Sequence, residues 1–285
     1  MLRGPASDTQ ITHLARLWLY ILGALVLLFL LGPIFIVIPM SFSDSTYLQF
    51  PPETWSLRWY REFFSSDEWL LATWVSFRAA FLTMLVSTPL GVAAAYGLHF
   101  SGSRWARMMR MALIIPLIIP IIILAIGAFY FYVNVGLVNT TAGLVLAHSV
   151  LAIPFVLVTA AAAFKQFDMN QEMVARSLGA SRLKAFLTVT LPQIHNSVVA
   201  GALFAFIVSF DEVVIALFIS SGPKSTITRR MFTSLRDQID PTIAAISTML
   251  IVASVILLGT AALLPAKKIS THIPTPQPMY AKYLI

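Results

Sequence analysis

The chain has 285 residues, of which 58% are hydrophobic and 11% charged, and its mean hydropathy is +0.84. A soluble core of this size cannot hide that much apolar surface, so the composition excludes a soluble globular protein and predicts one that sits in lipid. The absence of cysteine from the sequence excludes disulfides, zinc–thiolate sites and iron–sulfur clusters.

Six apolar stretches are each long enough to cross a hydrocarbon layer as a helix, which takes about 20 residues. In chain order they are 14–40, 69–98, 111–133, 141–164, 193–219 and 242–264. They predict an all-α, polytopic membrane protein with one transmembrane domain over residues 1–285. The first stretch is too long for a signal peptide and holds Pro33 and Pro39 where a cleavage site would stand, so we expect a retained helix. Pro116, Pro120 and Pro154 lie inside apolar stretches, where each permits a kink.

The net charge of +7 indicates the orientation of the chain once the Lys and Arg residues are assigned to individual loops, because these residues concentrate on the cytoplasmic side of membrane proteins. With the N-terminus inside, the cytoplasmic segments hold 12 of the 19 Lys and Arg residues: Arg3, Arg16, Arg104, Arg107, Arg110, Lys165, Arg176, Arg182, Lys184, Lys267, Lys268 and Lys282. We therefore expect both termini, the 165–191 loop and the 265–285 tail in the cytoplasm, and the 41–66 and 220–241 loops outside. The 220–241 loop departs from the rule, since it holds Lys224, Arg229, Arg230 and Arg236. The expected location is the bacterial inner membrane.

The 41–66 loop is polar and aromatic, with Pro51, Pro52, Trp55, Trp59 and Tyr60. This composition is typical of a loop followed by a short helix at the membrane interface, where aromatic rings concentrate. Two interpretations stay open: an interfacial anchor, and a docking surface for an external partner.

The most informative segment is the predicted cytoplasmic loop 165–191. Asp168 followed by Gln171 resembles a capping box, Gly179 can end the helix that follows, and Ser181 can cap a second helix reaching toward Leu191. We therefore expect a helix-turn-helix hairpin that projects from the membrane, with apolar and basic residues interleaved. Physical chemistry alone favours an amphipathic hairpin resting on anionic membrane lipid.

The same hairpin carries a sequence motif. Its residues are Glu172, Met173, Val174, Ala175, Arg176, Gly179, Ala180 and Ser181, with Leu191 and Pro192 at the end. From Met173 onward the run resembles the EAA loop of ABC-type import permeases, which reads Glu-Ala-Ala, three residues, Gly, nine residues, an aliphatic residue, one residue and Leu-Pro. The resemblance continues through 201–203, 209–214 and 222–223, and within the family it is most similar to the second permease of spermidine/putrescine-type systems.

The chain departs from this motif at its first position. Met173 stands where the family has Glu, and the nearest acid, Glu172, lies one residue earlier. One helical position is a rotation of about 100°, so Glu172 need not perform the role of the family's acid. Gly179 fits the motif, because a tight turn between helices needs a residue that accepts a positive φ.

The resemblance implies a division of labour among several chains. In the family the loop forms a coupling helix that sits in a groove of a cytoplasmic ATPase dimer, and the permease works with a second, homologous permease and an external or periplasmic substrate-binding protein. ATP is expected on the ATPase, because this sequence has no phosphate-binding loop and its 222–226 segment has the wrong glycine spacing. We expect no cofactor in this chain, no metal site and no nucleic-acid partner.

Two adjacent acids, Asp211 and Glu212, fall well inside the fifth apolar stretch. Intramembrane charges usually face a cavity or a partner, so the pair is a candidate lining for a pathway that attracts cations. Adjacent residues point about 100° apart, so at most one of them faces a pore squarely. The alternative is an interhelical ion pair with Arg78, which can equally snorkel to the external surface.

Three function classes can be compared on these features. An importer permease predicts a docking loop, a stand-alone secondary transporter predicts inverted repeats and discontinuous helices, and a membrane enzyme predicts convergent catalytic side chains. The sequence shows no clear repeat and no catalytic set, and we interpret the isolated polar residues His148, Asn134 and Tyr130 as interhelical hydrogen-bond partners. The expected function is an importer permease rather than an enzyme, and the resemblance implies a small cationic amine as substrate.

Overall fold

The computed structural model describes residues 16–237 and 239–263. The predicted tail at 265–285 and the two chain ends that we expect in the cytoplasm lie outside the described residues. The elements in chain order are α1 (Leu17–Met40), α2 (Arg58–Ser65), α3 (Asp67–Phe100), α4 (Arg104–Ile114), η1 (Ile115–Leu117), α5 (Ile121–Val135), α6 (Thr141–Gln166), α7 (Asn170–Ser177), α8 (Arg182–Ala185), η2 (Phe186–Thr190), α9 (Leu191–Phe210), α10 (Val214–Ile219), η3 (Gly222–Lys224), α11 (Ile227–Asp237) and α12 (Thr242–Leu263). The prediction of an all-α protein is confirmed.

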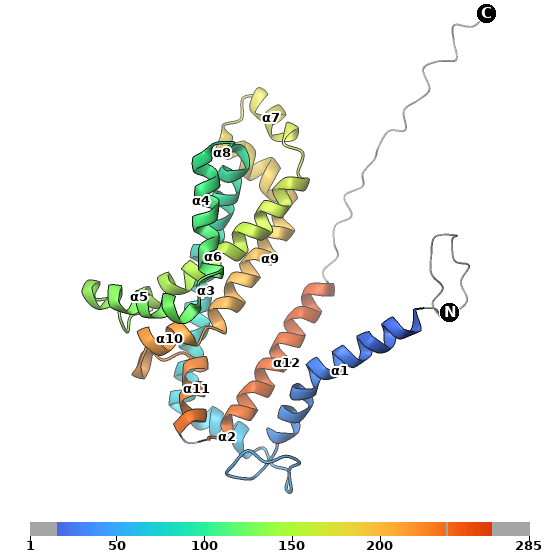
Figure 1. Cartoon of the computed structure of the whole chain (residues 1–285), viewed down its shortest axis with the longest axis vertical. Helices are drawn as coiled ribbons and strands as arrows, with labels where there is room; N and C mark the ends of the chain where they lie inside the picture. Colours follow the sequence, from blue (N-terminus) through green and yellow to red (C-terminus); the bar gives the residue numbers. More distant parts are fainter. Residues whose placement is uncertain (1–15, 238, 264–285) are drawn as a thin grey trace, which may run out of the picture.

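Three long helices, α3, α6 and α9, lie side by side and form the core of the molecule (Figure 1). They meet at Val156 of α6, which is fully buried. A Cβ atom built at Gly91 of α3 would lie 2.6 Å from Val156 Cβ, and one built at Gly201 of α9 would lie 3.3 Å from Val156 Cα and 2.6 Å from Thr159 Oγ1. Glycine is therefore required on both helices for the backbones to approach this closely, as at many helix crossings in membranes.

Within the described residues, four helices are long and apolar enough to cross a membrane: α1, α3, α6 and the continuous helix Arg182–Phe210, which comprises α8, η2 and α9. The third predicted span, 111–133, is not one straight helix, because the α4–η1 segment and α5 meet at an angle of 100°. Pro116 lies in η1 and Pro120 is the N-cap residue of α5, and neither has an amide proton to continue the helical ladder. This bent pair is a candidate fifth span, and residues Thr242–Ile256 of α12 form a shorter apolar helix.

The fifth predicted span is interrupted as well, since α9 ends at Phe210 and α10 begins only at Val214. The two short helices that follow the breaks, α5 and α10, pack against each other through an apolar cluster that includes Tyr132 and Ile215. Asn139 ties their ends together: its amide donates to the carbonyl of Ile219 at 2.7 Å, and its side-chain oxygen accepts from the amide of Ser221 at 3.0 Å.

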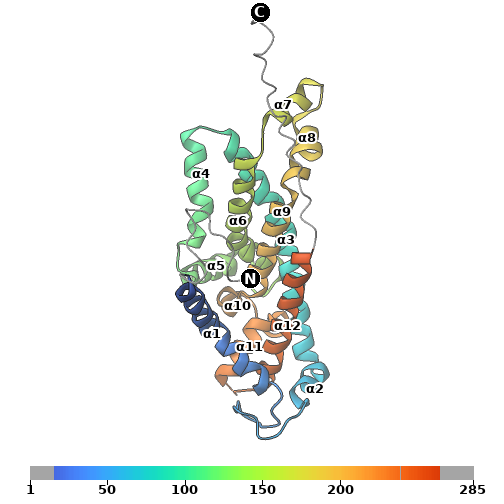
Figure 2. The same ribbon diagram turned by 90° about the vertical axis from the view of Figure 1, so that its right-hand side faces the viewer.

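The helices α1 and α12 contact each other and diverge from the core, as Figures 1 and 2 show. No residue of α1 is buried against the described part of the chain, although the helix is apolar along its whole length. A helix of this kind is covered in the membrane by lipid or by another chain.

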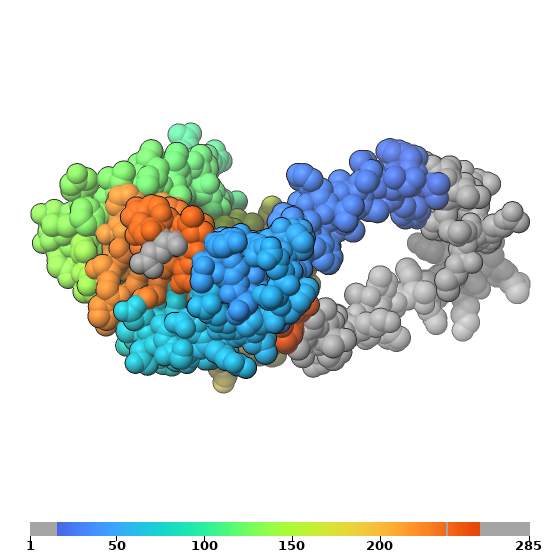
Figure 3. All heavy atoms as spheres, turned by 90° about the horizontal axis from the view of Figure 1, so that it is seen from below, coloured from blue at the N-terminus to red at the C-terminus, as the bar shows by residue number. Residues whose placement is uncertain are grey.

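The α7–α8 hairpin and the α2 region lie at opposite ends of the molecule (Figures 1 and 2). At the α2 end, the expected short helix of the 41–66 loop is confirmed as α2, with Trp59 and Phe63 buried. The loop before it is closed by an isolated β-bridge between Ser43 and Trp55. Figure 3 shows the molecule from this end. The α2 region and α11 lie next to each other in one surface, and α1 extends away from it to one side.

Candidate functional site

The hairpin at 165–191 begins with a short, exposed helix. Helix α7 ends at Ser177, and Gly179 follows in the turn as the sequence predicts, with a φ of +93° that other residues avoid. Ser181 caps the second helix as expected, because its Oγ accepts a hydrogen bond from the amide of Lys184 at 3.3 Å. The expected capping box is not formed: Asp168 Oδ1 accepts from the amide of Asn170 at 3.0 Å, and the side chain of Gln171 bonds to Gln193 instead.

The second arm of the hairpin is not a separate helix. It starts at Arg182 and continues through the π-helical segment η2 into α9, so the hairpin is α7 folded back against the extended end of a membrane helix. The wide turn has a cause in the sequence: a proline clashes with the carbonyl four residues earlier, and for Pro192 that residue is Thr188, inside η2. A π-helical turn just before Pro192 relieves that clash without ending the helix.

Large apolar side chains cover the outside of the hairpin. Met173, Val174 and Leu178 are exposed by 52%, 59% and 84% of their surface. Arg176 and Lys184 lie exposed beside them, while Ala175 and Ala180 are half-buried. Such a cluster of exposed apolar residues edged by cations is unusual on a surface that only faces water, and it marks an interaction site.

Glu172 points the other way, into the protein. It is 1% exposed, and its carboxylate accepts two short hydrogen bonds, from Tyr96 Oη at 2.5 Å and from Thr190 Oγ1 at 2.6 Å. The sequence argument that Glu172 need not act as the family's acid agrees with this geometry, because Met173 takes the outward position and Glu172 the inward one. Sequence analysis missed both donors, since Tyr96 lies 76 residues away and neither belongs to a motif.

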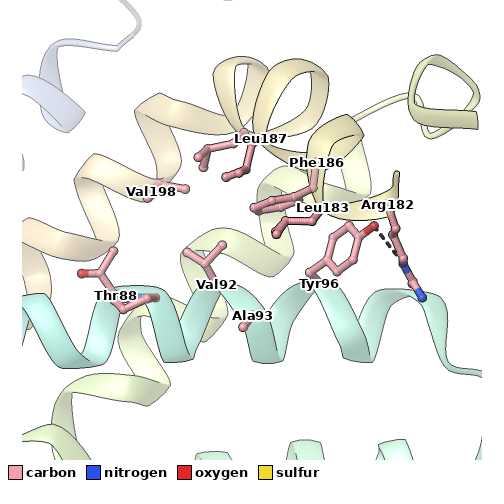
Figure 4. A pocket seen from close by; sticks show the side chains of 11 residues that line it. Thr88, Val92, Ala93, Tyr96, Arg182, Leu183, Phe186, Leu187 and Val198 are labelled. Atoms are coloured by element: carbon pink, nitrogen blue, oxygen red, sulfur yellow. Dashed lines mark hydrogen bonds between the residues drawn. The ribbon is translucent and has the colours of Figure 1, made fainter. Parts of the chain in front are cut away.

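A cavity of about 620 Å³ lies next to this carboxylate, between α3 and the Arg182–Phe210 helix. Figure 4 shows Leu183, Phe186 and Leu187 on one side of it, facing Val92 and the neighbouring residues of α3. Its polar edge is formed by Tyr96 and Arg182: Nε of Arg182 donates to Tyr96 Oη at 3.3 Å, and the guanidinium lies 5.3 Å from the centre of the tyrosine ring. Arg182, expected as a cytoplasmic charge, therefore also packs on α3.

The two acids of the fifth stretch lie at the break between α9 and α10, and they differ in environment. Glu212 is 7% exposed, and its Oε1 accepts from the amide of Ile215 at 2.9 Å, so it caps α10. Asp211 is exposed and its carboxylate has no partner among the described residues. Arg78 pairs with neither acid; it lies at a small pocket shared with Lys224. Of the three residues, Asp211 and Arg78 are exposed and Glu212 is buried.

A polar group inside the core joins the three long helices. His148 of α6 is fully buried, its Nδ1 lies 2.8 Å from Ser209 Oγ of α9, and that hydroxyl donates to Thr83 Oγ1 of α3 at 3.2 Å. The interpretation of His148 as an interhelical hydrogen-bond partner is confirmed. Asn134 Nδ2 donates to the backbone carbonyl of Tyr130 within α5 at 2.8 Å, so for Asn134 an interhelical bond is wrong. The Tyr130 side chain is exposed and makes no interhelical hydrogen bond within the part of the chain that the structure describes.

Two of the basic residues of the 220–241 loop, Arg230 and Arg236, have local acidic partners. Arg230 forms an ion pair with Glu68, and its guanidinium lies 4.9 Å from the centre of the Trp69 ring. Arg236 pairs with the adjacent Asp237 at 2.8 Å, which raises the pKa of its guanidinium. Burial lowers the pKa of Arg229. Arg230 thus holds α11 to the start of α3, and residues with such local roles are weak indicators of sidedness.

The fold and the hairpin together define a class of protein, the polytopic membrane transport components. Residues 87–269 match the family described as the binding-protein-dependent transport system inner membrane component, and the chain belongs to that family. It is a permease subunit of an ATP-driven importer and a multi-pass protein of the inner membrane. The discontinuous helices that we associated with stand-alone secondary transporters are present, but the family membership decides for the importer permease.

Individual relatives agree with this assignment. The chain is 28% identical over 236 residues to the spermidine/putrescine transport system permease protein PotC of Haemophilus influenzae, covering 82% of this chain and 91% of that protein. It is 29% identical over 244 residues to the putrescine transport system permease protein PotI of Escherichia coli, covering 82% and 85%. Its fold is similar to a crystal structure of a bacterial ABC transporter involved in the import of the acidic polysaccharide alginate, with a TM-score of 0.70, 15% identity and coverage of 91% of this chain and 99% of that one.

Proposed function

We propose that this permease imports a small cationic amine of the polyamine class and that its hairpin docks on a cytoplasmic ATPase. The observation that carries the docking is the exposed apolar face of Met173, Val174 and Leu178 at one end of the molecule. Apolar residues placed in that way lose water when a partner covers them, which is the main source of stability in a protein interface.

The remaining parts of the proposal follow from the family. ATP is bound by the ATPase dimer, a second homologous permease completes the membrane part, and an external or periplasmic binding protein delivers the substrate. The chain forms one transmembrane domain with six spans and with both termini and the hairpin in the cytoplasm, the bent α4–α5 pair counting as one span. The bare surface of α1 is consistent with a second permease or lipid around it. The polyamine class rests on the names of the two relatives.

Docking is tested by substituting one exposed apolar residue. Val174→Glu places a charge on the outer face of the hairpin without disturbing a packed core, so we expect it to reduce co-purification of the ATPase at least about tenfold. Leu57→Glu is the matched control, since Leu57 is 51% exposed at the opposite end of the molecule. Equal recovery of the ATPase with both variants would contradict docking through this face.

Substrate class is tested separately, by uptake of labelled solutes into vesicles that contain the complete transporter. We expect ATP-dependent uptake of a polyamine, and competition by other polyamines but not by neutral amino acids. Uptake of an anion or a neutral solute in preference to polyamines would overturn the substrate assignment and leave the docking proposal intact.

A further inference from the structure

The helix that carries the docking surface is held to the protein in an unusual way. Within α7 the one buried side chain is a carboxylate, that of Glu172. Ordinary surface helices are held by an apolar stripe, and here the apolar residues Met173 and Val174 face outward instead. The attachment of α7 to the membrane helices therefore depends on polar contacts: the hydrogen bonds of Glu172, and the one that Gln193 Nε2 of α9 donates to Gln171 Oε1 at 2.6 Å.

Those hydrogen bonds reach two different helices. Tyr96 lies near the end of α3, and Thr190 is the last residue of η2, where the extended helix enters α9. Distances of 2.5 and 2.6 Å are typical of hydroxyl groups that donate to an ionised carboxylate, which are the stronger hydrogen bonds of proteins. Glu172, Tyr96 and Thr190, here called the clamp, thus join α7, α3 and α9 at one point.

Both donors are held in place for this task. The Tyr96 ring packs edge-to-face on Phe164 and Phe186, with ring centres 5.7 and 4.9 Å apart, and Arg182 donates to its oxygen (Figure 4). The hydroxyl of Thr188, two residues before Thr190, makes the usual bond to the carbonyl four residues earlier, Lys184. Thr190 instead donates to Glu172, so its hydroxyl forms a hydrogen bond to a different helix, α7.

The surroundings of the clamp leave few other links at this level. The cavity of about 620 Å³ separates Leu183 and Leu187 from α3 just beyond Tyr96. Of the hydrogen bonds among the described residues, only the one from Tyr96 to Glu172 joins α7 directly to α3, so a displacement of α7 reaches α3 here through the clamp.

We propose that the clamp is the mechanical link that passes hairpin movement to α3 and α9, with Glu172, Tyr96 and Thr190 as positioning residues. This inference rests on the proposed function, in which the ATPase moves the hairpin. Glu172, the acid of this hairpin, then acts inside the permease, while the apolar Met173 occupies the outward-facing first position of the motif. Without the clamp, the ATPase still docks and hydrolyses ATP, but the membrane helices follow the hairpin poorly.

The first test measures the position of α7 directly. The sequence has no cysteine, so Ser177→Cys on α7 and Gly97→Cys on α3 give two unique spin labels on exposed, uncrowded sites. We expect one narrow distance distribution in the otherwise unchanged chain and a clearly broader one after Tyr96→Phe or Thr190→Val. Both substitutions keep the shape of the side chain and remove one hydroxyl. Thr188→Val, in the same segment, is the control and should leave the distribution narrow.

The second test measures coupling in the complete transporter. We expect Tyr96→Phe and Thr190→Val to keep ATPase co-purification and to lower the number of substrate molecules moved per ATP about tenfold, the factor that corresponds to losing one hydrogen bond to a charged group. In a Glu172→Gln background, either substitution should add little, because the members of one network are not independent. Tyr130→Phe, at an exposed tyrosine of α5, is the second control.

Three results would overturn the proposal: unchanged distances with an unchanged transport ratio, loss of ATPase binding with unchanged distances, or a full additional effect of Tyr96→Phe in the Glu172→Gln background. If the unsubstituted permease fails to bind the ATPase, the proposed function fails. The distance measurement still reports on the clamp in that case, so the two failures are distinguishable.

Discussion

Replacing Gly179 isolates the contribution of one turn to coupling. The residue has a φ of +93°, and a Cβ atom built there has no atom within 4 Å, so a substitution meets no steric barrier except from its own backbone. A residue with a side chain in this region costs about 1–2 kcal/mol, and a β-branched one up to about 3 kcal/mol. Asparagine tolerates such conformations better and costs about 1 kcal/mol or less. We therefore expect the order Gly, Asn, Ala, Val from best to worst.

These energies predict a measurable loss. A penalty of about 2 kcal/mol lowers the ratio of the native turn to its alternatives roughly 30-fold, which is enough to misplace α7 in a large fraction of molecules when the turn is only marginally favoured. The assay is ATPase co-purification and substrate uptake for Gly179→Asn, Gly179→Ala and Gly179→Val. Uptake should fall in the same order as the energies rise.

A second glycine provides the matched control. Gly102 lies in the α3–α4 connection, at the same end of the molecule, with open space around it and without a positive φ. Gly102→Val should keep both ATPase binding and uptake. If Gly179→Val behaves like Gly102→Val, the turn is not required for docking and the conformational argument is refuted.

Three further predictions concern the core, the acidic pair and the topology. Gly201→Val should lower the free energy of unfolding of the purified chain by about 1–3 kcal/mol or more. The reason is that a Cβ atom at position 201 would lie 2.6 Å from Thr159 Oγ1 in a packed helix crossing. Asp211→Asn should slow uptake of a cationic substrate at unchanged protein yield, since a carboxylate in a partly dehydrated pathway attracts cations strongly. Glu212→Gln should lower the yield, since it weakens the cap of α10 by about 1 kcal/mol. A cysteine introduced at Ser181 should be labelled from the cytoplasmic side only.

Each of these predictions has a control variant or an outcome that would contradict it. Gly23→Val, on the exposed helix α1 with open space around it, should leave stability unchanged, so an equal loss would contradict the argument from the crossing at Gly201. Wild-type uptake by both acidic variants would exclude a pathway role for the pair. External labelling at Ser181 would invert the topology and remove the hairpin from the ATPase side.

Much of the hairpin could be predicted because its determinants are local. Gly179 and Ser181 act on the backbone within a few residues of themselves, so a single sequence is enough to place a helix end and a helix start there. The prediction of a capping box formed by Asp168 and Gln171 was wrong, because several side-chain hydrogen bonds compete at the start of a helix. The bond of Gln171 to Gln193 depends on how α7 folds back on the next helix.

The sequence by itself determined that this protein is helical, lies in a membrane and carries a helical hairpin between its fourth and fifth apolar stretches, because hydrophobic length, charge and turn residues are properties of short segments. The tertiary structure decided the 100° bend between α4 and α5, the continuity of the hairpin with α9, and the burial of Glu172 against Tyr96. It also separated Arg78 from the acids of the fifth stretch. Prolines permit a bend without fixing its angle, and the partner of a buried polar group depends on which helices pack together, so neither can be obtained from spacing along one chain.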